Sequence, residues 1–270
     1  MAQSDKVFAG SVPETYDAYL VPLIFEQYAA DLANRVMAHA PRAILETAAG
    51  SGAVARALAP LLPPDARYVV TDLNQPMLDR AIARQGTDER IVWQQADALS
   101  LPFPDASFDV VCCQFGAMFF PDRVAAYREA LRVLKPGGTF LFSVWDRIED
   151  NDFARVVTDT LATLFPLDPP RFLARTPHGY HRKAQIEADV QAAGFSDVRI
   201  ETISRVSATP SPRVAAVAFC QGTPLRDEIA ARDTAALEKA TIQAAEAIAR
   251  TCGNGAVSGK TQAHVVTARP

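Results

Sequence analysis

One stretch, residues 43–52, constrains the fold more than any other part of the chain. It reads Ala-Ile-Leu-Glu-Thr-Ala-Ala-Gly-Ser-Gly, an apolar run that ends in Glu46 and passes at once into small residues. The helix-like pattern Val-Ala-Arg-Ala-Leu follows at 54–58. Small residues let a ligand lie against the backbone, and the first amides of a helix point toward such a ligand. The stretch therefore predicts a buried strand, a tight turn and a helix start beside a ligand.

A second acidic residue follows the next strand candidate. Residues 68–71 read Tyr-Val-Val-Thr, and Asp72 comes directly after them. Ligands of open α/β sheets bind outside the carboxyl ends of the strands. Two acidic residues at two neighbouring strand ends are typical of a nucleoside-binding α/β domain.

Runs of strand length alternate with helical patterns beyond Pro41. The strand candidates are 43–46, 68–71, 91–94, 108–113 and 139–144, and the helix candidates are 53–59, 76–84 and 122–133. Lys-Pro-Gly-Gly at 135–138 predicts a turn before the last of these strands. Strands that alternate with helices predict an α/β fold with a parallel sheet and right-handed crossovers.

Helical segments flank this alternating region. Residues 11–40 carry an apolar stripe at three- and four-residue steps, and we expect Pro22 near a helix start with a break before it. We expect an ordered loop at 164–181. A helix at 184–193, a strand at 198–206, an Ala-rich helical region at 212–251 and a terminal strand at 263–268 complete the chain. We expect a single domain over 1–270, with a helical lid at 1–40, a cofactor-binding core at 41–146, and a substrate-side lid, helical insert and closing strands at 147–270.

Composition excludes several kinds of partner. The formal net charge of the 270 residues is −4, and nucleic-acid binding depends on clustered Lys and Arg. No apolar stretch reaches the roughly 18 residues of a membrane span, and the polar first residues lack the apolar core of a secretory signal. The four cysteines show no metal-ligand spacing, and their small number suits a reducing cytoplasm. We expect a cytoplasmic monomer or homodimer with a small-molecule partner and no metal.

Three further segments make the pattern specific. Gln-Ala-Asp-Ala-Leu at 95–99 follows the third strand, Gln-Phe-Gly-Ala-Met-Phe at 114–119 follows the fourth, and a helix-turn string at 127–138 precedes the fifth. Together with Glu46 and Asp72, this ordered set resembles the class I S-adenosylmethionine-dependent methyltransferases, in the small-molecule group similar to the ubiquinone/menaquinone biosynthesis enzymes. The resemblance implies a Rossmann-like, doubly wound sheet of seven strands, mostly parallel with an antiparallel last strand, plus an N-terminal helical lid and a helical insert.

The resemblance also implies where S-adenosyl-L-methionine and its product S-adenosyl-L-homocysteine would bind. Ala48 stands where the family's first motif glycine is usual, and alanine is expected to fit there only if it keeps a negative φ and the cofactor does not press on it. Asp72 would accept both ribose hydroxyls, and Asp97 and the amide of Ala98 would bind the adenine edge. The full set of implied cofactor residues is Tyr16, Glu46, Ala48, Gly50, Gly52, Asp72, Leu73, Met77, Ala96, Asp97, Ala98, Gln114 and Phe115.

The acceptor side is less defined. Transfer from a sulfonium depends mainly on holding the nucleophile in line with the methyl group, and a general base is needed only if the acceptor loses a proton. Tyr16, His178 and His181 are the candidates for a catalytic side chain. Candidate pocket residues are Tyr19, Met118, Phe119 and Trp145, with Phe8 and Phe115 adding apolar surface. These residues predict methyl transfer to O, N or C of a small organic acceptor.

Two alternatives stay open at this point. A protein of the same fold that binds the cofactor without transferring the methyl group would carry the same motifs. A NAD-dependent dehydrogenase also has an acidic, Gly-rich turn, although dinucleotide sites usually begin that turn with glycine where Glu46 stands here.

Overall fold

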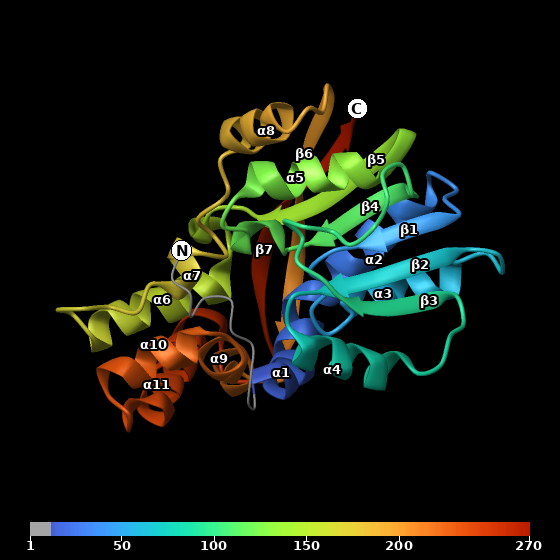
Figure 1. Cartoon of the computed structure of the whole chain (residues 1–270). Coiled ribbons are helices and arrows are strands. Elements are labelled where there is room, and N and C mark those ends of the chain that lie inside the picture. The colour runs from blue at the N-terminus through green and yellow to red at the C-terminus, as the bar shows by residue number, and fades with distance from the viewer. Residues whose placement is uncertain (1–11) are drawn as a thin grey trace. The chain divides into compact units, whose positions relative to one another are not determined.

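The computed structural model describes residues 12–270, which fall into two compact units (Figure 1). The first, here called the sheet unit, contains Glu26–Val144, Tyr180–Ile203 and Ala263–Pro270. The second, called the helical unit, contains the chain up to Phe25, Trp145–Gly179 and Ser204–Gln262. Phe8 lies outside the described residues. A single domain over 1–270 stays a prediction beside this division.

Seven strands form one sheet in the order β3-β2-β1-β4-β5-β7-β6. The parallel strands are β1 (Ala43–Glu46), β2 (Arg67–Asp72), β3 (Ile91–Gln95), β4 (Phe108–Gln114) and β5 (Leu134–Trp145). The others are β6 (Asp197–Thr209) and β7 (Val257–Arg269), with β7 antiparallel. The predicted fold class is confirmed. In this order β1 lies between β2 and β4, so the chain reverses its winding direction there, the position at which such sheets bind ligands.

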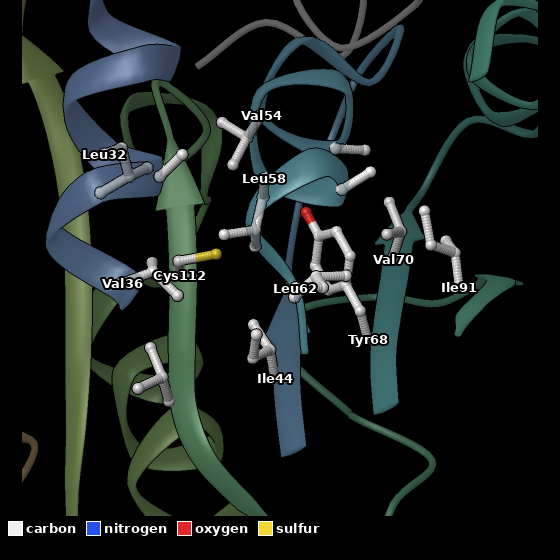
Figure 2. Close-up of a cluster of buried hydrophobic side chains, with 14 of the residues drawn as sticks. Leu32, Val36, Ile44, Val54, Leu58, Leu62, Tyr68, Val70, Ile91 and Cys112 are labelled. Carbon is white, nitrogen blue, oxygen red and sulfur yellow. The ribbon is translucent and has the colours of Figure 1, made fainter. Parts of the chain in front are cut away.

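One face of the sheet packs on helices α2 (Glu26–Met37) and α3 (Ala53–Leu58). Figure 2 shows Leu32 and Val36 of α2 and Leu58 of α3 facing Ile44 of β1 and Cys112 of β4. The three-residue 3-10 helix η3 (Ala59–Leu61) continues α3, and α4 (Gln75–Gln85) follows β2. This apolar packing fixes the strands and so the positions of their carboxyl ends.

The opposite face carries aromatic side chains. Tyr127 of α5 (Arg123–Val133) packs on Phe140 and Phe142 of β5, with ring centroids 5.5 and 5.1 Å apart. Asp122 begins α5 by accepting a hydrogen bond from the amide of Ala125. The 3-10 helix η4 (Ala117–Phe119) and α8 (Lys183–Ala192) complete this unit. Both Cys112 and Cys113 are fully buried and unoxidised, as expected for small apolar side chains of a central strand.

The helical unit consists mainly of helices. They are α1 (Val12–Thr15), the π-helix η2 (Tyr16–Phe25), η5 (Ile148–Asp150), α6 (Asp152–Leu164), α7 (Phe172–Arg175), α9 (Pro212–Gln221), α10 (Leu225–Arg232) and α11 (Ala236–Cys252). Helix α11 packs against both α6 and α9, and α9 also packs against η2. The helical region predicted at 212–251 is confirmed and consists of three helices, α9, α10 and α11.

Three sequence predictions need correction. Pro22 lies inside η2 with no break before it, because the wider turn of a π-helix accommodates a residue that has no N–H and crowds the preceding turn. Helix α6 has no counterpart among the predicted elements. Strand β5 begins at Leu134, before the predicted turn, and residues 135–138 form an irregularity between the pairs Phe108–Leu134 and Val110–Thr139, with Gly137 at φ of 78°.

Candidate functional site

The turn after β1 brings backbone and small residues together as predicted. The amide of Thr47 donates to Cys112 of β4, and the amide of Ala49 donates to Thr71 of β2, both over 2.9 Å. Gly50 and Gly52 have φ of 58° and 79°, which glycine adopts without strain. A Cβ on Gly52 would lie 2.9 Å from the Cβ of Ala81 in α4. Glycine at 52 is therefore required both by conformation and by space.

Ala48 departs from the expectation of a negative φ. Its φ is 52°, in the left-handed region, where an L-residue other than glycine is strained by about 1–2 kcal/mol. A Cβ on Gly116, after β4, would lie 2.5 Å from the Cβ of Ala48. The methyl group of Ala48 thus points toward the backbone of Gly116, and the absence of a side chain at 116 makes room for it.

Glu46 is almost completely buried at the end of β1. Its side chain is 1% exposed, and Oε2 accepts a hydrogen bond from the hydroxyl of Tyr68. Oε1 is buried without a hydrogen-bond partner. Burial raises the pKa of Glu46 to about 8, and the hydrogen bond from Tyr68 acts in the opposite direction. An unpartnered buried carboxyl oxygen costs free energy, and a ligand that donates to it would remove that cost.

Asp72 holds the turn from the neighbouring strand. Its Oδ2 accepts from the amide of Gly50 over 2.8 Å, and its Oδ1 accepts from the amide of Asn74 over 2.8 Å. Burial raises the pKa of Asp72, partly opposed by the hydrogen bonds from Asn74 and Gly50. A carboxylate has about four acceptor sites. Oδ1 also accepts from the side-chain amide of Asn74 over 3.4 Å, which leaves the acceptor capacity for a ligand hydroxyl mainly on Oδ2.

The segment after β3 lies at the same edge of the sheet as Asp72. The amide of Ala96 donates to the carbonyl of Asp72 over 3.1 Å. Asp97 is exposed, and its Oδ1 accepts from the amide of Leu99 over 2.9 Å. Leu73 is 46% exposed, whereas Met77 is 3% exposed. Leu73 and Asp97 thus present accessible side chains near the strand ends, and Met77 packs in the interior.

The segment after β4 is also strained. Phe115 has φ of 52°, an uncommon conformation for a bulky residue, and such strain gathers at functional sites. Its ring packs edge-on against Tyr28 of α2 at 5.4 Å. Gln114 and Phe119 are half-buried, and Met118 is 1% exposed. In this structure Met118 packs in the interior, so its assignment to an acceptor pocket stays a prediction.

The helical unit holds the remaining candidates on the acceptor side. Tyr16 is half-buried with its ring 5.3 Å from that of Phe25, and Tyr19 is 40% exposed. The Nδ1 atom of the buried His178 lies 2.8 Å from the carbonyl oxygen of Asp146, and its ring is 6.1 Å from that of Trp145. A small cavity beside these two rings is lined by Ile24, Trp145, Asn151, Phe153, Ala154, His178, Phe219 and Thr261.

His181 belongs to the sheet unit and has a different environment from His178. Its carbonyl accepts a hydrogen bond from Nε2 of His264 over 3.0 Å, and the Nδ1 atom of His264 lies 3.0 Å from the hydroxyl of Thr202. These contacts join β6 and β7 through the imidazole of His264. They give His264 a structural role and show that the backbone of His181 takes part in it.

Tyr68 is the site residue that motif reasoning missed. Tyr68 pairs with Ile44 in the sheet register, and its hydroxyl reaches Glu46 two residues further along β1. The sequence signal that could have revealed Tyr68 is the alternation of side-chain direction along a strand. Because Ile44 and Glu46 point to the same face, a polar-tipped aromatic residue paired with Ile44 can reach the carboxyl group.

The residues at these strand ends fit S-adenosylmethionine. The glycine turn leaves room near the backbone, Asp72 has acceptor capacity for ribose hydroxyls, and Leu73 offers exposed apolar surface. The unpartnered Oε1 of Glu46 suits a cationic donor. Among the described residues, 12–270, no cluster of three or more His, Cys, Asp or Glu is arranged to hold a metal ion. The same residues include no helix long and apolar enough to cross a membrane.

Comparison with known proteins agrees with this geometry. Residues 45–142 match the family described as a methyltransferase domain. The ubiquinone/menaquinone biosynthesis C-methyltransferase UbiE of Ectopseudomonas mendocina is 30% identical over 219 residues, which are 69% of this chain and 85% of that protein. The demethylmenaquinone methyltransferase of Deinococcus radiodurans is 41% identical over 107 residues, 39% of this chain and 44% of that protein.

A solved structure shows the same fold. Phosphoethanolamine N-methyltransferase 2 of Haemonchus contortus, in complex with S-adenosyl-L-methionine, superposes with a TM-score of 0.59 at 17% identity, covering 98% of this chain and 59% of that one. The relationship to UbiE and the match over the cofactor-binding strands exclude the dehydrogenase alternative. The chain belongs to the class I S-adenosylmethionine-dependent methyltransferases, as a distant relative of the UbiE group.

Proposed function

We propose that this enzyme transfers the methyl group of S-adenosylmethionine to a small, largely apolar organic acceptor. The observation that carries the proposal is the meeting of two buried carboxyl groups, Glu46 and Asp72, at a left-handed glycine turn where the sheet reverses its winding. When bound, the cofactor supplies a methyl group on a sulfonium leaving group. The protein's task is then to hold the cofactor and the acceptor in place.

The cofactor side of the proposal rests on the sheet unit. Asp72 accepts the ribose hydroxyls, Leu73 covers one side of the adenine, and Asp97 accepts from its amino group. Ala98 supplies a backbone amide, and Glu46 accepts from the amino-acid end. The other contacts in the proposal come from Ala48, Gly50, Gly52, Met77, Ala96, Gln114 and Phe115, with Tyr16 from the helical unit.

The acceptor side rests on the helical unit. The side chains around Trp145 and His178 are mainly apolar, which supports an apolar acceptor, but the cavity beside them, of about 10 Å³, is water-sized and would have to widen to admit it. A backbone carbonyl accepts only, so Nδ1 of His178 carries the hydrogen in its bond to Asp146. In the neutral ring Nε2 then has the lone pair that a base needs, which supports His178 as a proposed base, with His181 as a second candidate. Tyr19, Met118 and Phe119 remain proposed pocket residues.

The methylated atom is proposed as O, N or C. The name of the UbiE relative specifies carbon methylation in quinone biosynthesis, which supports testing phenolic and quinol-like rings first. Oligomeric state is proposed as monomer or homodimer. We also propose a cytoplasmic location, in keeping with the free thiols of Cys112, Cys113, Cys220 and Cys252.

A substrate panel tests this function. The purified protein is incubated with S-adenosylmethionine and phenols, quinols, amines and activated carbon acids, and formation of S-adenosylhomocysteine is measured. We expect turnover with at least one apolar acceptor, lost in Asp72→Ala and reduced in His178→Gln for an acceptor that must lose a proton. A protein that binds the cofactor but methylates no member of a broad panel would support the non-catalytic alternative instead.

A further inference from the structure

The buried Tyr68 holds one oxygen of the buried Glu46 carboxyl group, and the other oxygen has no hydrogen-bond partner. Tyr68 is 0% exposed, and Figure 2 shows its ring among the apolar side chains between the sheet and α3, with the hydroxyl oxygen at one end. That hydroxyl donates to Oε2 of Glu46. Oε1 of the same group is buried without a partner. The carboxyl group is therefore held from one side only.

Burial outweighs the charged groups that face Glu46. Asp72 on β2 acts to raise its pKa, and Arg56 on α3 lowers it as the smallest of the four influences. The guanidinium of Arg56 donates to the carbonyl of Ser51 over 2.6 Å. Cys112 and Cys113 on β4 are buried thiols whose own pKa values are raised, chiefly by burial, so they stay neutral. A buried carboxylate without a counter-charge favours its neutral form.

We propose that Glu46 holds a proton while no cofactor is bound and releases it to solvent when the ammonium group at the amino-acid end of the cofactor binds, with Tyr68 as the positioning residue that fixes the carboxyl group. This inference rests on the proposed function, because it assigns Glu46 to the cofactor. The ammonium group brings both a hydrogen-bond donor for Oε1 and a positive charge directly beside it. Ionised Glu46 then forms a charge-assisted hydrogen bond with it.

The proton balance sets the sign of the pH dependence. One proton leaves Glu46 for the buffer, and no bond in the cofactor changes. Burial raises the pKa of Glu46 to about 8 in the protein alone, so near pH 7 the group is mostly protonated before binding. Affinity for a ligand that carries the ammonium group therefore increases with pH, approaching about tenfold per pH unit below pH 8.

Tyr68 sets the midpoint of this dependence. Its hydrogen bond lowers the pKa of Glu46 against the effect of burial. Removing the hydroxyl in Tyr68→Phe raises that pKa further, so the rise in affinity moves to higher pH and binding at pH 7 weakens. A purely structural role would weaken all ligands equally and leave the pH profile unchanged.

Calorimetric titration in buffers of different ionisation enthalpy measures the released proton directly. The probes are S-adenosylhomocysteine, which carries the ammonium group, and 5′-methylthioadenosine, which lacks the amino acid. At pH 6.5–7 we expect about one proton released for each S-adenosylhomocysteine bound and none for methylthioadenosine. Glu46→Gln should bind without releasing a proton. Tyr127→Phe removes a buried hydroxyl elsewhere in the sheet unit and should keep the wild-type profile.

The comparison of the two ligands needs only the wild-type protein, so it holds even if a variant fails to fold. Binding of S-adenosylhomocysteine without proton release, or equal release by Glu46→Gln, would overturn the inference while leaving methyl transfer intact. A wild-type pH profile in Tyr68→Phe would overturn the role of Tyr68. Proton release by a protein that methylates no acceptor would instead count against the proposed function alone.

Discussion

Carboxyl groups at the two edges of the parallel sheet have pKa values that are shifted in opposite directions. At the amino ends of the strands, Asp109 of β4 accepts from Lys135 and from the amides of Ala43 and Arg42 over 2.7–2.8 Å. Burial acts to raise the pKa of Asp109, but these hydrogen bonds outweigh it and bring the pKa below its usual value. At the carboxyl ends, Glu46 and Asp72 both have raised pKa values because burial dominates.

These opposite pKa shifts distinguish the two edges. The edge at the amino ends of the strands stabilises the fold, and the edge at their carboxyl ends, here called the binding edge, is the proposed cofactor site. Every oxygen of Asp109 has a partner within the protein, so this carboxylate stabilises the fold by itself. Glu46 keeps an unpartnered oxygen. Left-handed residues that are not glycine lie at both edges, Ala48 and Phe115 after strands and Ala40 and Ala106 before them, so the unpartnered carboxyl oxygen is what separates the edges. A fold retains such a cost where a ligand offsets it.

The largest expected effect is on stability as a function of pH. A carboxyl group whose pKa is raised by folding binds more protons in the folded state, so stability falls as pH rises from its unfolded to its folded pKa. For Glu46 that window runs from 4.5 to about 8. We expect the free energy of unfolding to fall by up to about 4 kcal/mol between pH 5 and 8. Urea denaturation across this range should show a much flatter profile for Glu46→Gln, and an equal slope in both proteins would contradict the assignment.

Two glycines with nearly the same φ, one at each edge of the sheet, allow a second comparison of the edges. Gly52 and Gly137 have φ of 79° and 78°, but only Gly52 has a neighbour that an added Cβ would strike. Gly52→Ala should lose about 2–4 kcal/mol through strain and overpacking together, and Gly137→Ala about 1 kcal/mol through strain alone. Urea denaturation of both variants measures the difference, and equal losses would mean that space at 52 is not limiting.

The smallest effect concerns the strained alanine of the binding edge. Ala48→Gly removes the left-handed strain at a cost in unfolded-chain entropy, so we expect a net gain of up to about 1 kcal/mol. Cofactor affinity should change little, because the methyl group points toward Gly116. Ala40→Gly is the matched control, since Ala40 has φ of 46° just before β1. Destabilisation by Ala48→Gly, measured in urea, would show that its methyl contact outweighs the strain.

The sequence predicted the strand ends better than the local conformations. The bounds of β1 were correct because an apolar run and a small-residue turn leave little freedom around Glu46. The expectation that Ala48 fits only with a negative φ was wrong, because its fit depends on a missing side chain at Gly116, far along the chain. The start of β5 was wrong because Leu134 pairs with Phe108 before the irregular segment that the local turn signal marks.

The helical unit was harder to predict for a different reason. Helix α6 carries an apolar stripe at Phe153, Val156, Val157 and Leu161, and this periodicity is the signal from which it could have been predicted. The π-helical path through Pro22 depends on tertiary packing against α9. The hydrogen bond from Tyr68 to Glu46 was within reach of strand register, but register becomes known only once β1 and β2 are paired.

The most direct test of the account compares cofactor binding after one substitution at each edge. S-adenosylhomocysteine is titrated calorimetrically into the wild-type protein, Asp72→Ala and Asp109→Ala. We predict that Asp72→Ala loses at least about a hundredfold in affinity, or about 2.7 kcal/mol, while Asp109→Ala binds normally although it is less stable by about 2 kcal/mol. Normal binding by Asp72→Ala, or loss of binding in a folded Asp109→Ala, would contradict the assignment of the carboxyl edge as the cofactor site.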